Sequence, residues 1–143
     1  MTTTTARAQS VAPPSKTLRG VLWGAQILLA LAFLSAGAMK AIQPIAVLVE
    51  KMVWPGALPE GLVRFIGVSE FLGGLGLILP AAFRIKPILT PLAGVGLATI
   101  MTFASVFHVT RGELGVLPIN FVLGGLAAFV AWGRLKKAPI SAR

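Results

Sequence analysis

The sequence predicts an all-α integral membrane protein, a four-helix bundle with a short interfacial helix between its first and second spans. Hydrophobic residues make up 56% of the 143-residue chain and charged residues only 12%, whereas soluble domains are roughly 45 to 50% apolar and about 25% charged. Apolar runs long enough to cross a hydrocarbon core of roughly 30 Å recur along the chain. Most basic residues lie in short segments between or beside these runs. This distribution is typical of a membrane protein and argues against a nucleic-acid partner, although the net charge is +9.

The first span is predicted over residues 20–39. It follows a threonine-rich tail, residues 1–19, that cannot bury an apolar face and is expected to be disordered. A cleaved signal peptide is an alternative, because basic residues precede the run and Ala36-Gly37-Ala38 resembles a cleavage site. Because the run reaches about 20 residues, the length of a membrane span, a retained helix is favoured over a signal peptide.

Residues 40–61 contain three prolines and one short apolar piece, residues 45–54, that carries Glu50 and Lys51. This piece is too short to cross a bilayer. We expect it to lie at the membrane surface as an interfacial helix, with Trp54 among the lipid headgroups.

The other three spans are predicted over residues 62–79, 88–109 and 116–132. Pro80 is expected to end the second span, and a basic turn at residues 83–87 leads into the third. Residues 110–115 join the third span to the fourth, and a basic tail, residues 133–143, completes the chain.

Charge predicts the orientation of the four spans. The two tails and the turn after the second span hold nine basic residues and no acid: Arg7, Lys16, Arg19, Arg84, Lys86, Arg134, Lys136, Lys137 and Arg143. The segments at the opposite ends of the spans carry Glu50, Glu60 and Glu113. Since basic loops stay in the cytoplasm, both termini are expected to be cytoplasmic.

Glu70 stands inside the second apolar run, where a charge is costly. Placing one at the centre of a bilayer costs roughly 2.5 to 3.5 kcal/mol, so such residues face a bundle interior and have a partner. Gly67, Gly73 and Gly74 lie three or four residues away, and glycines on one helix face allow a neighbouring helix to approach closely. We therefore interpret Glu70 as an acid directed into the bundle and as a candidate functional group.

In the predicted topology the other polar residues near the helix ends share one half of the membrane with Glu70, which lies roughly 10 Å below the boundary. We predict one polar pocket that opens to the non-cytoplasmic side, lined by Lys40, Glu70, His108, Arg111, Asn120 and Arg64. Glu70 and His108 are the candidates for proton exchange, because an imidazole near a carboxylate titrates near neutral pH. For Asn120 a purely structural hydrogen bond is favoured. For Lys40, Arg64 and Arg111, extension of the side chain to the headgroups is an equal alternative.

Cysteine is absent and histidine occurs once. These counts exclude disulfides, thiol redox chemistry, an iron–sulfur cluster held by cysteines of this chain, and a bis-histidine haem within one protomer. We expect no metal site and no covalently bound cofactor.

Four stretches carry a family resemblance: FLSAGAMK, IGVSEFLGGLGLILP, ASVFHVTRGE and FVAWGR, which end at Lys40, Pro80, Glu113 and Arg134. Together they resemble the DoxX-like family of small four-span bacterial membrane proteins, over about Leu18 to Arg134. The resemblance implies a four-helix domain in a bacterial inner membrane. It also implies a link to membrane redox systems, since some relatives are small subunits of thiosulfate:quinone oxidoreductase. On this basis we expect a quinone or a lipid as the ligand of the pocket. The lack of cysteine argues against direct sulfur chemistry by this chain.

Three functional hypotheses follow, and the residues alone leave enzymatic activity open. The first is a redox-associated subunit whose pocket holds a quinone or a similar apolar molecule, with Glu70 and His108 exchanging protons while a partner subunit supplies electrons. The second is a non-catalytic membrane module that anchors or assembles a partner. The third and weaker one is a proton-coupled carrier of a small solute, because four spans are few for alternating access unless the chain forms a homodimer. The lipid bilayer is an expected partner in each case.

Overall fold

The computed structural model describes residues 13–143, and this part of the chain is helical without strands. Four long helices form the bundle: α1 (Lys16–Ile42), α3 (Glu60–Phe83), α4 (Leu89–Thr110) and α5 (Leu117–Trp132). Short helices connect and extend them: α2 (Ile45–Met52), η1 (Trp54–Ala57), η2 (Leu114–Val116) and the π-helical turn η3 (Gly133–Lys137). The segments containing α1, α3, α4 and α5 are each long and apolar enough to cross a membrane. The predicted fold class is therefore confirmed.

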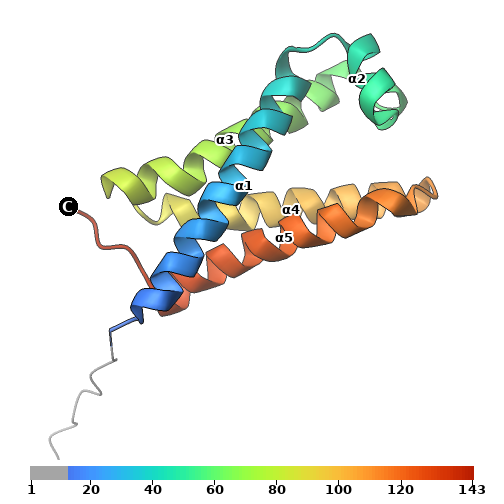
Figure 1. Cartoon of the computed structure of the whole chain (residues 1–143). Coiled ribbons are helices and arrows are strands. Elements are labelled where there is room, and N and C mark those ends of the chain that lie inside the picture. Colours follow the sequence, from blue (N-terminus) through green and yellow to red (C-terminus); the bar gives the residue numbers. More distant parts are fainter. Residues whose placement is uncertain (1–12) are drawn as a thin grey trace, which may run out of the picture.

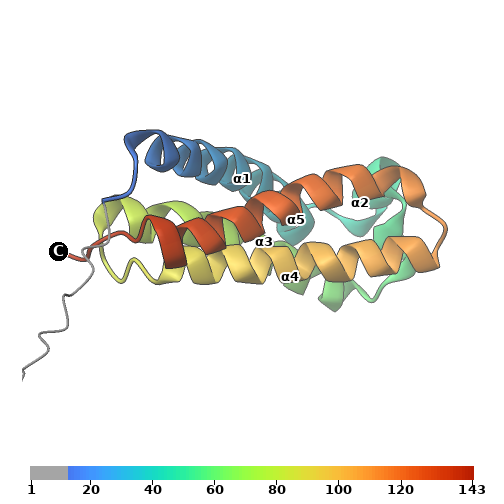
Figure 2. The same cartoon turned by 90° about the horizontal axis from the view of Figure 1, so that it is seen from below.

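The four long helices are arranged as two pairs. α1 packs mainly on α3, α4 packs mainly on α5, and the pairs meet chiefly through α3 and α4. In Figure 1 the α1–α3 pair diverges from the α4–α5 pair toward α2, while Figure 2 shows all four helices running along one general direction. We call the end with α2, η1 and η2 the pocket end, and the end with the start of α1 and the C-terminus the basic end.

The packed interior is small and apolar. Its buried cluster draws on all four long helices: Leu29, Phe33, Leu77, Leu97, Met101, Ala127 and Val130. Large apolar side chains also cover the outside, with Leu31 67% exposed and Phe103 71% exposed. An apolar exterior of this kind suits lipid rather than water.

Glycines fix the crossing of α1 and α3 near the pocket end. A methyl group at Gly67 would come within 2.7 Å of the Lys40 Cβ and of the Ala41 backbone nitrogen. A methyl group at Gly37 would come within 2.7 Å of the Gly67 carbonyl oxygen. The two backbones therefore touch, as expected where glycines face each other in membrane helices. This contact brings Lys40 of α1 beside Glu70 of α3.

Several helix ends differ from those expected. Residues 16–19 form the first turn of α1 instead of the tail, because the Ser15 hydroxyl caps that turn by accepting a hydrogen bond from the Leu18 N–H at 3.1 Å. Residues 1–12, expected to be disordered, lie outside the described residues. α3 continues through Pro80 to Phe83 and ends at Arg84, whose φ of 57° is left-handed. A proline inside a helix removes one hydrogen bond, and membrane helices tolerate that loss where neighbours compensate. Residues 133–137, expected in the tail, extend α5 as η3.

Candidate functional site

The partner of Glu70 is Lys40. The Lys40 Nζ donates to the Glu70 Oε2 at 2.5 Å, and the two side chains are only 10% and 3% exposed. A single buried charge would be costly, whereas a hydrogen-bonded pair of opposite charges offsets much of that cost. The close contact of α1 and α3 thus places a compact, overall neutral polar group inside the pocket end.

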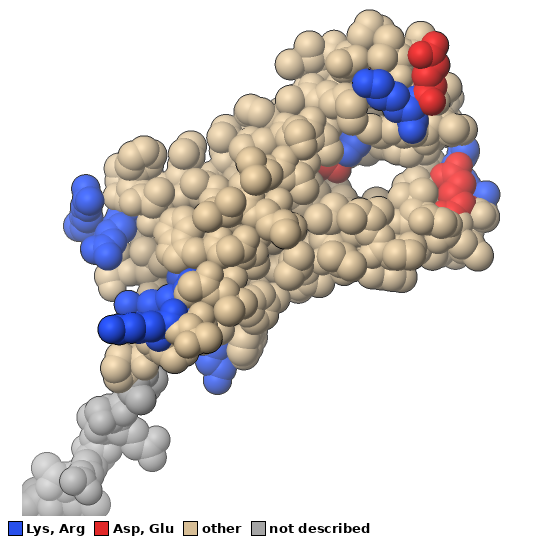
Figure 3. All heavy atoms as spheres, viewed as in Figure 1, with Lys and Arg blue, Asp and Glu red and all other residues tan. Residues whose placement is uncertain are grey.

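A cavity of about 480 Å³ adjoins this pair, between the two helix pairs. Its walls are mostly aromatic and aliphatic, and its polar lining residues are Lys40, Glu70, His108 and Asn120. Figure 3 shows the molecule hollowed at this end, with a basic and an acidic side chain beside the opening. Phe65 and Phe103 also line the cavity and are 67% and 71% exposed. The cavity therefore reaches the apolar outer surface between the helix pairs.

Trp54 of η1 forms part of the cavity wall, which sequence reasoning missed. Its ring packs edge-on against His108 and Phe107, with ring centroids 6.3 Å apart in both pairs, and the Lys40 Nζ lies 5.8 Å from the Trp54 ring centroid. Val53 directs the chain from α2 into η1 with a φ of 60°, a strained value for a β-branched residue. No pattern in this proline-rich segment distinguishes a tryptophan at the headgroups from one that folds over the bundle.

His108 at the end of α4 pairs with Glu113 rather than with Glu70. The His108 Nδ1 lies 2.7 Å from the Glu113 Oε2, and the Arg111 Nε donates to the Glu113 Oε1 at 2.8 Å. The hydrogen bond with His108, and to a smaller extent the one from Arg111, holds the pKa of the Glu113 carboxyl below its ordinary value. With Nδ1 engaged, Nε2 is the ring nitrogen of His108 that remains for a ligand in the cavity.

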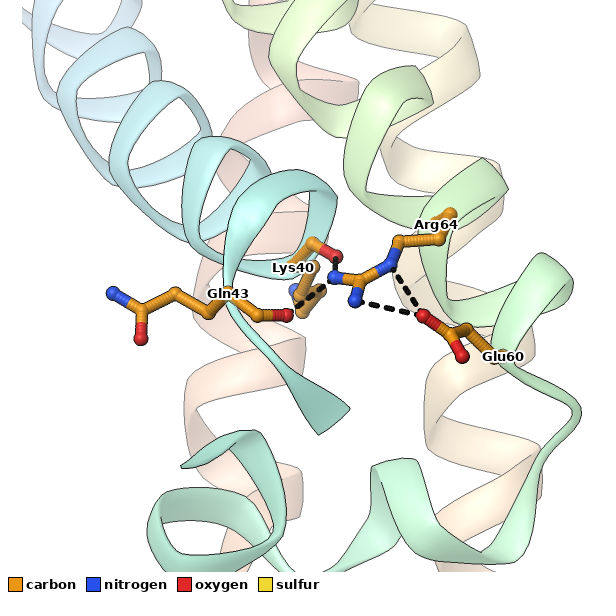
Figure 4. A network of polar contacts seen from close by, with 4 residues as sticks. All are labelled: Lys40, Gln43, Glu60 and Arg64. Carbon is orange, nitrogen blue, oxygen red and sulfur yellow. Dashed lines mark hydrogen bonds and ion pairs between the residues drawn. The ribbon is translucent and has the colours of Figure 1, made fainter. Parts of the chain in front are cut away.

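Arg64 and Arg111 were predicted in the lining, and the structure does not bring them into it. Figure 4 shows Arg64 beside the end of α1, where its Nη1 donates to the carbonyl oxygens of Lys40 and Gln43 at 2.8 and 2.5 Å and its Nη2 donates to Glu60 at 2.9 Å. Arginines satisfy the free carbonyls of helix C-termini in this way. Arg64 therefore holds α1 against the start of α3, and Arg111 holds Glu113.

Asn120, near the start of α5, is 7% exposed, and its Nδ2 has no hydrogen-bond partner among the described residues. A buried donor without a partner costs roughly 1 to 3 kcal/mol, so such groups usually have a role. Asn120 lines the cavity beside Lys40 and Glu70 and also a groove of about 600 Å³ between α4 and α5. Its amide supplies an unused donor next to an apolar space.

The predicted site residues thus divide into two groups. Lys40, Glu70, His108 and Asn120 line one cavity, whereas the two arginines stabilise helix ends beside it. The first group comes from four different long helices, so it forms only when the two helix pairs are packed together.

Comparison with known proteins yields one family. A sequence model described as the DoxX-like family matches residues 24–130, which include all four polar residues of the cavity. No curated protein and no solved structure gave a match. The match covers well over half of the chain and agrees with its four membrane helices. This multi-pass membrane protein therefore belongs to the DoxX-like family.

Proposed function

We propose that this protein is a small subunit of a membrane redox system and holds a quinone, or a similar apolar molecule with a carbonyl group, in the cavity at the pocket end. The observation that carries the proposal is the unused Asn120 amide beside the Lys40–Glu70 pair in a mostly apolar cavity. Ligand sites are commonly of this kind, apolar spaces of roughly 300 to 1,000 Å³ with a few convergent polar groups.

The cavity suits the three parts of such a molecule: a flat ring, a ring carbonyl and an apolar tail. Trp54 and Phe107 provide aromatic surface for a flat ring. The Asn120 Nδ2 donates to a ring carbonyl. The opening between Phe65 and Phe103 leads an apolar tail toward the lipid, from which a membrane-soluble ligand enters.

In this proposal, residues of this chain supply the protons and a partner subunit supplies the electrons. Reduction of a quinone to a quinol takes up two electrons and two protons at the two carbonyl oxygens. A redox partner subunit supplies the electrons. His108, through Nε2, and the Lys40–Glu70 pair, in which the Lys40 ammonium carries the proton and the Glu70 carboxylate receives its replacement, supply the two protons. Both groups are then reprotonated from water at the pocket end.

We infer that the protein lies in a bacterial inner membrane with both termini in the cytoplasm. All four acidic residues of the chain lie at the pocket end and most of the basic residues at the basic end, the asymmetry expected when the basic end is cytoplasmic.

The absence of cysteine from the sequence allows a direct test of this orientation. A membrane-impermeant thiol reagent applied to intact cells should label Ala57→Cys and should label Ser141→Cys only after lysis; the reverse pattern would contradict the inferred orientation.

Ligand binding is tested through tryptophan fluorescence. Trp54 lines the cavity, whereas Trp23 and Trp132 lie on the halves of α1 and α5 toward the basic end. A short-chain naphthoquinone or ubiquinone should quench the fluorescence saturably in the wild type and in Trp132→Phe, and the saturable component should vanish in Trp54→Phe. Quenching that does not saturate, or that is equal in all three proteins, would refute the proposal.

The Asn120 contact is tested by the same titration. Asn120→Leu should weaken binding by up to about tenfold, because one hydrogen bond contributes roughly 0.5 to 1.5 kcal/mol. Thr102→Val is the matched control, since the Thr102 hydroxyl bonds to the Ala98 carbonyl of its own helix at 2.9 Å and does not line the cavity. Equal weakening in both variants would exclude a specific role for the amide.

A second candidate is a module that anchors or assembles a partner, and the Lys40–Glu70 contact favours it because each charge already satisfies the other. Glu70→Gln separates the two candidates in the intact complex. Slower quinone turnover with the complex still assembled supports the redox function. Unchanged quinone binding and turnover, with lower stability or lower recovery of the partner, supports the anchoring function.

A further inference from the structure

The basic end contains a buried cation that forms no ion pair with a carboxylate among the described residues. Arg134 of η3 is only 5% exposed. Its Nε donates to the Gln26 Oε1 at 2.7 Å and its Nη1 to the Ala138 carbonyl oxygen at 3.4 Å, while its Nη2 has no partner among the described residues. The Trp23 ring lies 5.4 Å from the guanidinium carbon and covers one side of it. All of these partners are neutral.

No acidic side chain of the protein can reach Arg134. The chain has only four, Glu50, Glu60, Glu70 and Glu113, and all lie at the pocket end. The tendency of basic residues to stay in the cytoplasm explains exposed lysines and arginines at this end. It does not explain a buried guanidinium, because buried charges are normally paired.

A cavity of about 190 Å³ beside Arg134 is lined by further positively charged side chains. Three arginines from separate parts of the chain line it, Arg19 of α1, Arg84 after α3 and Arg134, and the remaining lining residues are Trp23, Ala81, Pro139, Ile140 and Ser141. The C-terminal segment closes the cavity, since the Arg143 N–H donates to the Arg84 carbonyl oxygen at 3.2 Å. Three like charges held around one space repel each other unless an anion lies between them.

We propose that this cavity binds a phosphate group, supplied by the headgroup of an anionic phospholipid or by free inorganic phosphate. Arginine side chains bind phosphate oxygens through paired, charge-assisted hydrogen bonds, which makes them the preferred residues for this anion. The phosphate supplies the negative charge that Arg134 lacks. The site lies at the opposite end of the bundle from the quinone cavity, and it does not depend on the proposed function.

The surroundings favour the lipid headgroup as the source. A second cavity of about 240 Å³ shares Arg134, Pro139 and Ile140 with the first, and its other lining residues are apolar: Pro87, Ile88, Pro91 and Leu135. A phosphate in the first cavity therefore has an apolar neighbour that accommodates the glycerol and upper acyl chain. Basic pockets between membrane helices bind lipid headgroups in this way.

The experiment measures lipid binding to the full-length protein in detergent by native mass spectrometry. Phosphatidylglycerol and inorganic phosphate are titrated separately. Arg19→Gln/Arg84→Gln removes two exposed arginines of the cavity without disturbing buried Arg134. Its affinity for phosphatidylglycerol should fall by about tenfold or more, as expected for the loss of charge-assisted hydrogen bonds. Lys16→Gln/Lys86→Gln is the matched control, because it removes the same charge from the same helix and turn outside the cavity, and its affinity should change less than about twofold.

Each outcome decides the proposal. Loss of phosphatidylglycerol binding in the arginine variant alone, with no effect of inorganic phosphate, supports the site with a lipid headgroup as its ligand. Competition by inorganic phosphate, with a rise in melting temperature that the arginine variant lacks, supports the site with free phosphate as its ligand. An equal loss in the arginine and lysine variants, or no loss in either, would show a general surface attraction and overturn the proposal.

Discussion

Within residues 13–143, each end of the bundle buries one lysine or arginine, and the ends differ in what balances its charge. At the pocket end, Lys40 meets the carboxylate of Glu70 at 2.5 Å. At the basic end, Arg134 meets an amide, a backbone carbonyl and the face of a tryptophan. One end therefore carries a pair that is neutral overall, and the other carries an uncompensated positive charge.

The placement of a few acidic residues therefore decides which ligand each end of an apolar bundle can accept. With only four acidic residues in the chain, all at one end, the pocket end can neutralise its own buried charge. Its cavity then suits an uncharged molecule with a hydrogen-bond acceptor. No acidic side chain lies at the basic end to neutralise Arg134, so its cavity suits an anion.

The largest expected effect comes from breaking the pair at the pocket end. Glu70→Leu leaves Lys40 buried without a counter-charge and should lower the free energy of unfolding by roughly 3 to 5 kcal/mol. Lys40→Met/Glu70→Leu should recover most of this loss, because an apolar pair of similar size often replaces a buried ion pair without cost. Unfolding in mixed micelles with increasing denaturing detergent measures both variants. A double variant as unstable as Glu70→Leu would show that the unpaired lysine is not the cause.

The helix contact that forms the pair is tested at Gly67. A methyl group there would lie 2.7 Å from the Lys40 Cβ and the Ala41 backbone nitrogen, so Gly67→Ala must push α1 and α3 apart at the pocket end. We expect a loss of roughly 1 to 3 kcal/mol in the same unfolding assay. Gly24→Ala, on the part of α1 near the basic end, has no atom within 4 Å of the added methyl group. It should leave stability unchanged or raise it by up to about 1 kcal/mol, and an equal loss in both variants would contradict a specific contact.

The difference between the ends can also be removed by adding an acid to the basic end. Ser141 is exposed and lines the cavity with Arg19, Arg84 and Arg134. Ser141→Glu should raise the free energy of unfolding by up to about 1 kcal/mol, the range for partly exposed ion pairs, and should weaken phosphatidylglycerol binding. Ser141→Gln, of the same size and without the charge, should do neither. Stronger lipid binding in Ser141→Glu would contradict an anion site there.

The sequence predicts the architecture of this protein better than its contacts, for physical reasons. Lengths of apolar runs and the cost of a charge in lipid are enough to predict four spans and to direct Glu70 inward. Depth along the helices also brings Lys40, His108 and Asn120 to the same half of the bundle. These arguments do not fix which side chains touch, because a helix can rotate about its axis without changing the depth of its residues. The pairings of Glu70 with Lys40 and of His108 with Glu113 therefore required coordinates.

Two features escaped sequence reasoning altogether. Trp54 lines the cavity at the start of η1, directly after Val53, whose strained φ of 60° no local pattern predicts. Arg134 is buried because the helical structure of α5 continues through η3, whereas a basic sequence after an apolar run suggests an exposed tail. In both cases tertiary packing determined the conformation of a segment that lacks a clear apolar period.

The smallest expected effect is a pH dependence confined to the pocket end. Because hydrogen bonds from His108 and Arg111 lower the pKa of Glu113 in the folded protein, they stabilise the connection between α4 and α5 above the ordinary pKa of a carboxyl group. That contribution is lost as the pH falls through the lowered value, since the protonated acid no longer accepts both hydrogen bonds. Hydrogen exchange at residues 112–116 should therefore quicken in acid more than the intrinsic exchange rate predicts, and Glu113→Gln should remove this pH dependence. Residues 133–137 serve as the internal control, because no acidic side chain lies at the basic end, and a matching transition there would show global acid unfolding instead of a local effect.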